Sequence, residues 1–475
     1  MSSHSVCVLL ATALLASAAP VVAPADALSG ADFFNTDRVI AKAAPEYRPH
    51  AGVGCELPAA ALTLDKAIDL ALCRNPSTRA AWAAAQVQAA SLGVAEGAYL
   101  PSIGINAAGN ELTGDLYPGA PRSGTQDSRN AVATLSWTLL DFNARRSAEA
   151  NARNLVLAAA HIGSATAQRT VADVIQGYFS VVATEQAVTA NLQTEANAAK
   201  SLEIARALQS GGAATLADVM QADTAYQQAI YTRIQSTNTA KASRANLAVL
   251  LGFSADQALA LAAVAAPSAP ALTARVGELL TQAARQRPDL AAARDQRAAA
   301  EAAVTSARAV GRAKVTFGVQ RTLNQQPGLA EQNTNTVGLS VVLPLFSGLQ
   351  THYGIRRAEA ALDEVAAQEE QSRLAVSLDV WNAYHALDAG NQELATSATL
   401  AKAAATNEEI AIGRYQSGVG SMLDVLTAQS AGANARVIRI QSEYNWQSAR
   451  AQLALAVGRL SSVADLDAVA PSSAP

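Results

Sequence analysis

The strongest constraint on the fold of this chain is a very long helical stretch that occurs twice. Residues 143–208 and 350–416 contain no proline. At about 1.5 Å rise per residue, each stretch would span on the order of 100 Å as an α-helix. Val171, Val174 and Tyr178 recur at the spacing of a helical seam. We therefore expect an array of long coiled-coil-like helices rather than an ordinary globular bundle.

The two long stretches belong to a tandem duplication. Tyr178 and Tyr384 are separated by the same number of residues as Asp218 and Asp424. Each copy also ends in an apolar residue followed by glycine. Because the period is so long, the chain consists of two copies of one large unit and not of a solenoid of short repeats.

Each copy also contains two stretches in which apolar and polar residues alternate. Val337, Leu339 and Val341, for example, alternate with Gly338 and Ser340. Period two is typical of a strand with one apolar face, and lengths of about ten residues suit strands that cross a membrane. The expected strands are 101–112, 130–140, 313–322 and 335–345.

Four strands are too few for a membrane barrel, because open sheet edges are not tolerated in lipid and barrels begin at about eight strands. A membrane protein of this kind must therefore pool strands from several chains. The alternative is two soluble β-hairpins that rest on a helical bundle.

These signals define the expected organisation. Each repeat has the order helix, two strands, long helix, glycine turn and helix. The turns are expected at 209–215 and 417–421. The segments are a signal peptide (1–27), an N-terminal extended segment (28–61), a first repeat (62–252), a linker (253–272), a second repeat (273–458) and a C-terminal tail (459–475).

The N-terminus has the features of an export signal. Residues 6–19 form an uncharged apolar run, and Ala25-Asp26-Ala27 offers a small-x-small cleavage site. No later segment has the roughly twenty uncharged apolar residues of a transmembrane helix. The mature chain is thus expected to be a soluble secreted, lipid-anchored or β-barrel protein.

Two cysteines, Cys55 and Cys73, remain after the predicted signal is removed. An even pair in an oxidising compartment is compatible with a disulfide, which would contribute about 3 kcal/mol to stability. The alternative is a buried Cys73 thiol on an apolar helix face, with Cys55 in a loose segment.

Composition and motifs argue against several functions. The net charge is −4 and no basic run is present, so nucleic-acid binding is not expected. The five histidines are scattered without the spacing of zinc ligands. Neither a nucleophile elbow nor a phosphate-binding glycine-lysine loop is visible. We expect no catalytic residues, no cofactor, no metal and no enzymatic activity.

Both glycine turns are followed by a hydroxyl residue and, three positions later, an aspartate. Thr215 precedes Asp218, and Ser421 precedes Asp424. This spacing predicts a capping box, in which the hydroxyl caps the helix and the acid closes the box. An acid in the first turn also complements the helix dipole.

The ordered motifs of both halves resemble those of the TolC family of outer-membrane efflux and secretion channels. The resemblance covers about residues 62–460 and is carried by "LTLDKAIDLALCRNPSTRAA", "GAYLPSIGI", "LSWTLLDFNARRSAEA" and "GRYQSGVGSMLDVLTAQ". Within the family, the first motif and the upstream Cys55 are most similar to the CyaE-like branch, which serves type I secretion.

The resemblance implies a mainly α fold with a transmembrane β-barrel part. A homotrimer would form a 12-stranded barrel in outer-membrane lipid and an α-helical periplasmic tunnel. It also implies a periplasmic adaptor (membrane fusion) protein and an inner-membrane ABC or RND transporter as partners. The competing class is a periplasmic adaptor or structural long-helix protein. Such a protein would usually have one hairpin rather than the twofold repeat.

The resemblance also assigns roles at the turns. Asp424 matches an aspartate that constricts the channel, and Asp218 and Tyr415 match a pair that holds the periplasmic tip shut by a hydrogen bond. Thr427 stands where a second constricting aspartate would be, and Gly420 stands where a latch arginine would be. Capping and constriction are compatible roles for the same aspartates.

Overall fold

The computed structural model describes residues 32–44, 55–58, 60–114, 124–263, 275–326 and 330–468. The predicted signal peptide lies outside the described residues. So do parts of the N-terminal segment, the linker and the C-terminal tail.

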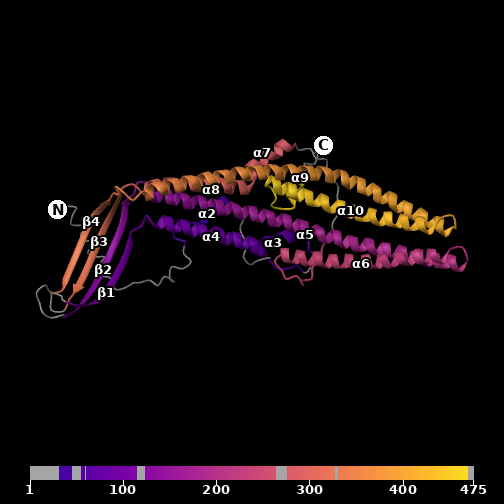
Figure 1. The fold of residues 1–475 in the computed structure, drawn as a ribbon, viewed down its shortest axis with the longest axis horizontal. Coiled ribbons are helices and arrows are strands. Elements are labelled where there is room, and N and C mark those ends of the chain that lie inside the picture. Colours follow the sequence, from indigo (N-terminus) through magenta and orange to yellow (C-terminus); the bar gives the residue numbers. More distant parts are fainter. Residues whose placement is uncertain are drawn as a thin grey trace.

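Two helical hairpins make up most of the molecule. Helices α5 (Ala144–Ser210) and α9 (Gln350–Gln416) have 67 residues each. Each turns back into a shorter helix, α6 (Leu216–Leu250) or α10 (Met422–Val457). In Figure 1 both hairpins extend to the end of the molecule opposite the sheet. Helix α5 packs against α4, α6, α8 and α10, so it contacts both repeats.

Shorter helices occupy the start of each repeat. Helices α4 (Pro76–Gly97) and α8 (Pro288–Ala309) each begin at a proline, which suits the first turn of a helix. Each follows a helix that the sequence analysis did not predict, α3 (Leu64–Arg74) or α7 (Val276–Gln286). Two further short helices are α2 (Asp37–Ala43) and α11 (Ala464–Ala468). No helix in the described ranges has the length and apolar content needed to cross a membrane.

The strands form one antiparallel sheet in the order β1-β2-β3-β4. Their bounds are Ser102–Gly114, Gly124–Leu140, Lys314–Gln325 and Gln332–Val342. Strand β2 begins at Gly124 rather than at 130, because the polar residues before 130 pair regularly with β1. The β2–β3 pair joins the two repeats, with Trp137 opposite Phe317.

The apolar positions of the two outer strands lie on an open surface. Ile103, Ile105, Val337, Leu339 and Val341 are 61–76% exposed. In Figure 1 the sheet projects from one end of the helical part. A contiguous apolar surface of this kind marks an interaction or membrane surface.

The largest apolar core lies where α3, α5, α6, α7, α9 and α10 meet. Tyr178 of α5 is fully buried there. Its hydroxyl donates to the carbonyl oxygens of Leu62 at 3.1 Å and Ala262 at 3.2 Å. Tyr178 thereby ties the long helix to the start of the first repeat and to the linker that follows it. Its counterpart Tyr384 is only partly buried, so the two copies are not equivalent.

A left-handed glycine ends each repeat. Gly252 has φ +79° and Gly458 has φ +82°. A Cβ atom at Gly458 would lie 2.9 Å from the Cα atom of Arg287. Both the backbone conformation and the close approach therefore require glycine at this position.

We expect Gly458→Ala to lower the stability of the protein by about 1–3 kcal/mol, because alanine is strained at positive φ and would contact Arg287. Gly354→Ala is the matched control, since a Cβ there meets nothing within 4 Å inside helix α9. Thermal unfolding of the detergent-solubilised protein measures the stability of both variants. Equal transition temperatures for the two variants would contradict this account.

Candidate functional site

The turns at the tips of the two hairpins have the same backbone geometry. Gly212 has φ +75° and Gly418 has φ +73°. The amide of Ala213 donates to the Leu208 carbonyl at 2.8 Å, and that of Val419 donates to the Arg414 carbonyl at 3.0 Å. These bonds satisfy the last carbonyls of the long helices in a Schellman arrangement.

Both predicted capping boxes are present. Asp218 Oδ2 accepts from the backbone amide of Thr215 at 2.9 Å and from its hydroxyl at 2.8 Å. Asp424 Oδ2 accepts from the Ser421 amide at 3.1 Å, and Ser421 Oγ accepts from the Asp424 amide at 3.1 Å. Capping is therefore one role of both aspartates.

Asp424 is exposed on the first turn of α10. The backbone amide of Ser421 lowers the pKa of the Asp424 carboxyl, and the Ser421 hydroxyl and the charge of Arg414 act in the same direction. The carboxylate is thus charged and accessible at neutral pH. Thr427 is also exposed, one turn further along the same helix.

Tyr415 lies in an apolar cluster between the two hairpins. It is 6% exposed. The other buried members of the cluster are Leu202, Ala205, Val219, Ala222, Met422 and Val425. Burial raises the pKa of the Tyr415 hydroxyl, and the negative charge of Asp218 raises it further.

The structure thus brings Tyr415 and Asp218 together without a hydrogen bond between them. Within the described residues, the buried Tyr415 hydroxyl has no hydrogen-bond partner. Gly420 lies beside Tyr415, and a Cβ there would be 3.2 Å from Tyr415 N and from Arg414 Cβ. Gly420, which the resemblance matches to a latch arginine, therefore has little room for a side chain.

A set of exposed apolar residues at the tips was not predicted from the sequence. Leu216 and Met220 on α6, and Val419 and Leu423 at the second turn, are 52–67% exposed. Each lies within a few residues of a capping box. For Leu216 and Leu423, the signal available in the sequence was a large apolar residue in the first turn after a capping residue.

Cys55 and Cys73 form a disulfide, with their Cα atoms 6.0 Å apart. Arg74 Nη1 donates to the Cys55 carbonyl at 3.3 Å, and the Arg74 guanidinium lies 4.3 Å from the ring centroid of Phe253. The bridge attaches the segment before the first repeat to the end of α3. In Figure 1, α3 lies near the middle of the molecule, away from the tips.

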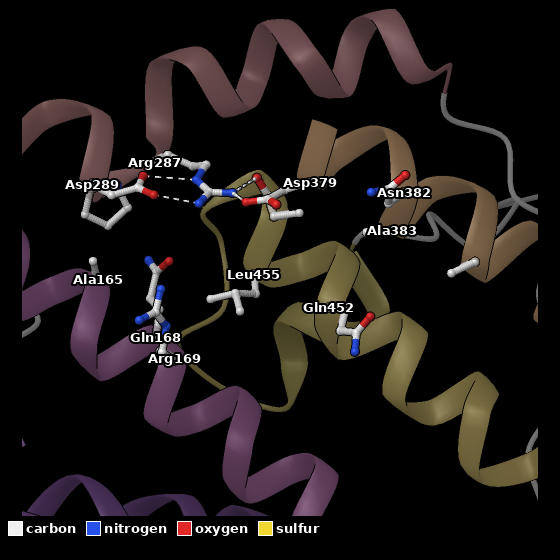
Figure 2. A pocket seen from close by; sticks show the side chains of 13 residues that line it. Ala165, Gln168, Arg169, Arg287, Asp289, Asp379, Asn382, Ala383, Gln452 and Leu455 are labelled. Atoms are coloured by element: carbon white, nitrogen blue, oxygen red, sulfur yellow. Dashed lines mark hydrogen bonds and ion pairs between the residues drawn. The ribbon is translucent and has the colours of Figure 1, made fainter. Parts of the chain in front are cut away.

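A cavity of about 410 Å³ lies between α5 and the second repeat. Figure 2 shows Arg287 on its wall, bound by two carboxylates. Arg287 donates to Asp289 at 2.6 and 3.0 Å and to Asp379 at 3.1 Å. Burial opposes the charge of Arg287, but the two aspartates outweigh it and raise its pKa. The group is a paired structural contact within the second repeat, and it joins the start of α8 to α9.

Among the described residues, no group of three or more His, Cys, Asp or Glu side chains is placed to hold a metal ion.

A duplicated subunit with two long helical hairpins and a four-stranded sheet at their base is the architecture of an outer-membrane channel protomer. The family model described as outer membrane efflux protein matches residues 67–253 and 279–459. The chain belongs to this family.

The curated relative Protein CyaE of Bordetella pertussis (strain Tohama I) is 29% identical over 381 residues, which is 79% of each chain. Solved structures of similar fold include the outer-membrane channel OprN and the outer membrane protein VceC from Vibrio cholerae. Both are 20% identical to this chain and cover 83% of it, with 89% and 96% of their own chains matched and TM-scores of 0.74 and 0.72. The resemblance to the TolC family is confirmed, as is the fold class.

The geometry of the second capping box predicts a pH dependence at the tip. Because the pKa of Asp424 is depressed, its ionised form stabilises the start of α10 above the ordinary Asp pKa of 3.8. This contribution is lost as the pH falls through the lowered value. Hydrogen exchange of the first-turn amides of α10 should therefore be slower in the wild type than in Asp424→Asn at pH 7.

This difference in hydrogen exchange between the wild type and Asp424→Asn should vanish at a pH below the depressed pKa of Asp424. Ser421→Ala is the companion variant, and we expect it to cost about 1 kcal/mol of local stability by removing the cap. A difference in amide protection that persists unchanged to the lowest pH would contradict the assigned role of the Asp424 carboxylate.

Proposed function

We propose that this chain forms an outer-membrane channel-tunnel that passively conducts substrates exported by an inner-membrane transporter and a periplasmic adaptor. The observation that carries the proposal is the separation of two surfaces. An apolar strand surface lies at one end of α5 and α9, and the hairpin tips lie at the other (Figure 1). Helices of 67 residues place these ends on the order of 100 Å apart.

Three copies of the chain complete the channel in this proposal. One copy has four strands, with β1 and β4 at the edges of the sheet. A homotrimer gives twelve strands and closes these edges, which a barrel in lipid requires. The sheet then lies in the outer membrane, and the hairpins form a tunnel through the periplasm.

The adaptor binds at the tips in this proposal. Leu216, Met220, Val419 and Leu423 offer apolar contacts at the far end of the hairpins. The free energy for export comes from the inner-membrane partner, of the ABC or RND class. The channel itself supplies a path and a gate.

Type I protein secretion is the function we favour over multidrug efflux, because the chain is similar to Protein CyaE over 79% of both sequences. To separate secretion from efflux, the protein is crosslinked in its native membrane and the captured transporter is identified. An ABC exporter supports secretion, and an RND pump supports efflux.

Fractionation and bilayer recording test the channel against an adaptor or structural role. We expect a heat-modifiable oligomer in outer-membrane detergent extracts that conducts ions across a planar bilayer. A salt-extractable periplasmic protein without conductance would support the competing class.

Tyr415 and Asp218 are proposed as a latch at the tip. Both hydrogen bonds that Asp218 accepts from Thr215 use Oδ2, so Oδ1 can accept from Tyr415 without loss of the cap. The buried Tyr415 hydroxyl lies close enough for the charge of Asp218 to raise its pKa. A hydrogen bond to Asp218 Oδ1 would satisfy a hydroxyl that is costly to bury alone.

Tyr415→Phe decides whether the latch forms. With a latch, we expect the variant to raise single-channel conductance in a planar bilayer and to lower thermal stability by about 1 kcal/mol. Asp218→Asn is the partner variant and should also raise conductance. An unchanged conductance together with a higher melting temperature would mean that the hydroxyl is never bonded and that Asp218 only caps α6.

Asp424 is proposed to narrow the lumen. In a trimer, three such carboxylates would form a ring that binds multivalent cations. We therefore expect Asp424→Asn to weaken block by multivalent cations about ten-fold or more, since each tenfold is about 1.4 kcal/mol of binding. Asp363→Asn, an exposed aspartate far from the tip on α9, is the control. Equal block of both variants would remove the constriction role.

A further inference from the structure

The two faces of the sheet differ in chemistry. Ile103, Leu135, Val319 and Val337 pair in one row across the four strands. Because side chains alternate along a strand, this row defines one face, which we call the apolar face. The other face, the polar face, carries Ser, Thr, Asn, Gln or Gly at most of its positions. In the proposed barrel, the apolar face contacts lipid and the polar face lines the lumen.

The charged residues of the strands do not follow this division. Of the charged residues in the four described strands, only Lys314, at the start of β3, lies on the polar face. Glu111, Asp127, Arg129 and Arg321 lie on the apolar face, in the half of the sheet away from the helices. A charge on the lipid face is costly at the bilayer midplane and far less costly near the interface. Their positions therefore indicate a polar partner at the outer edge of the apolar face.

Arg321 has neutral neighbours on every side. Ala133 lies opposite it on β2, and Asn335 lies opposite it on β4. The adjacent residues of β3 on the same face are Val319 and Leu323. Arg321 is half-buried, and its side chain has no hydrogen bond or ion pair within the described residues. This cation thus lacks the carboxylate partner that a structural arginine would have.

Both arginines lie where the apolar residues of this face end. On β4 the apolar positions end at Val337, and the next residue on the face, Asn335, pairs with Arg321. On β2 they end at Ala131, and the next residue on the face is Arg129. A long arginine side chain can cover apolar surface and still extend its charge to a polar boundary. With the helices in the periplasm, this boundary is the outer leaflet.

A hollow of about 550 Å³ lies beside Arg129 on this face. It is lined by the small residues Ala107, Gly109 and Ala131, and by Leu323. Ala131 pairs with both Ala107 and Leu323, so these residues share one row. The hollow therefore has a cation at its outer side and an apolar wall toward the helices. That combination suits an amphiphile with an anionic headgroup.

Carboxylates lie further out than the arginines. Glu111 and Asp127 pair with each other, two residues beyond Arg129 along β2. Glu331, at the outer end of β4, lines the hollow and accepts from Gln325 Nε2 at 3.2 Å. An anion at the edge of the apolar face thus meets the arginines first. Donor groups of a larger headgroup would meet the carboxylates beyond them.

A second copy of the chain does not cover this region in the proposed trimer. Copies join at the edge strands β1 and β4, whereas Arg129 and Arg321 lie on the inner strands β2 and β3. The pairing of β2 and β3 is complete within one chain. The arginines are therefore left to contact the membrane.

We propose that Arg129 and Arg321 bind the phosphate groups of a lipid in the outer leaflet, whose acyl chains lie along the apolar rows between the arginines and the helices. This inference rests on the proposed channel function, which places the sheet in the outer membrane. A guanidinium matches a phosphate with two parallel hydrogen bonds, and Asn335 offers a further amide donor opposite Arg321. The lipid fixes the depth of the barrel in the bilayer.

Native mass spectrometry of the full-length protein in mild detergent measures this binding. The probe is lipid A, a glycolipid with two phosphate groups, and the comparison is the same glycolipid without its phosphates. We expect the wild type to prefer the phosphorylated form. Arg129→Gln/Arg321→Gln should weaken lipid A binding about ten-fold or more, since each tenfold is about 1.4 kcal/mol of binding. Binding of the dephosphorylated lipid should stay unchanged.

Two further variants separate phosphate binding from a general effect of charge. Lys314→Gln removes a cation from the polar face at the other end of β3 and is the matched control, with binding equal to the wild type. Arg321→Lys keeps the charge and should bind lipid A more tightly than Arg321→Gln does. The oligomeric mass in the same spectra shows that each variant is assembled.

A wild type that binds both forms of the lipid equally would overturn the lipid site, as would a double variant that binds lipid A like the wild type. A conducting oligomer with either result would leave the channel function intact. A salt-extractable periplasmic protein without conductance would instead overturn the channel function, and the lipid site with it.

Discussion

The rest of the structure depends on the two open edges of a four-stranded sheet. β1 and β4 each pair with one neighbour in the described chain, and their apolar residues face outward. In lipid, unpaired backbone groups cost several kcal/mol each, and in water such an edge promotes aggregation. Both costs disappear when copies of the chain join edge to edge. In the proposed trimer, the helices of the three copies would then lie side by side around a common axis.

Helix α5 connects the two repeats of the subunit. It contacts the first repeat through α4 and α6 and the second through α8 and α10. The duplication supplies two similar hairpins, but the residues between them differ. Tyr415 and Glu408 belong to the second copy, where the first has Gln209 and Leu202. A symmetric duplication would give two equivalent hairpins, whereas here Glu408 of the second hairpin accepts a hydrogen bond from Asn197 of the first.

Much of the fold could be predicted from local patterns. The long proline-free stretch and the glycine turn that follows it predicted α9, and period-two alternation located all four strands. The ends of the strands were less accurate, because backbone pairing continues through polar residues such as Arg129 and Gln325. The expected order has one helix before the strands of each repeat, so α3 and α4 were not separated. Asn75 is a one-residue break between them, with the extended backbone expected before proline.

The tip was predictable only where its contacts are local. The capping boxes involve residues three apart, so spacing alone identified them. Burial of Tyr415 and its approach to Asp218 depend on how two distant hairpins pack. The bond between Asn197 and Glu408 joins residues 211 positions apart, and nothing in the neighbourhood of either residue signals it. In a helix that is exposed along much of its length, a glutamate is ordinarily a surface residue.

The most direct test of the account is the mass of the complex extracted from the outer membrane. The protein should be purified in mild detergent and its copy number measured by native mass spectrometry. The account predicts three copies per complex, because three sheets of four strands close all edges into a twelve-stranded barrel. A stable, folded monomer would contradict it, since β1 and β4 would then be stable without partners.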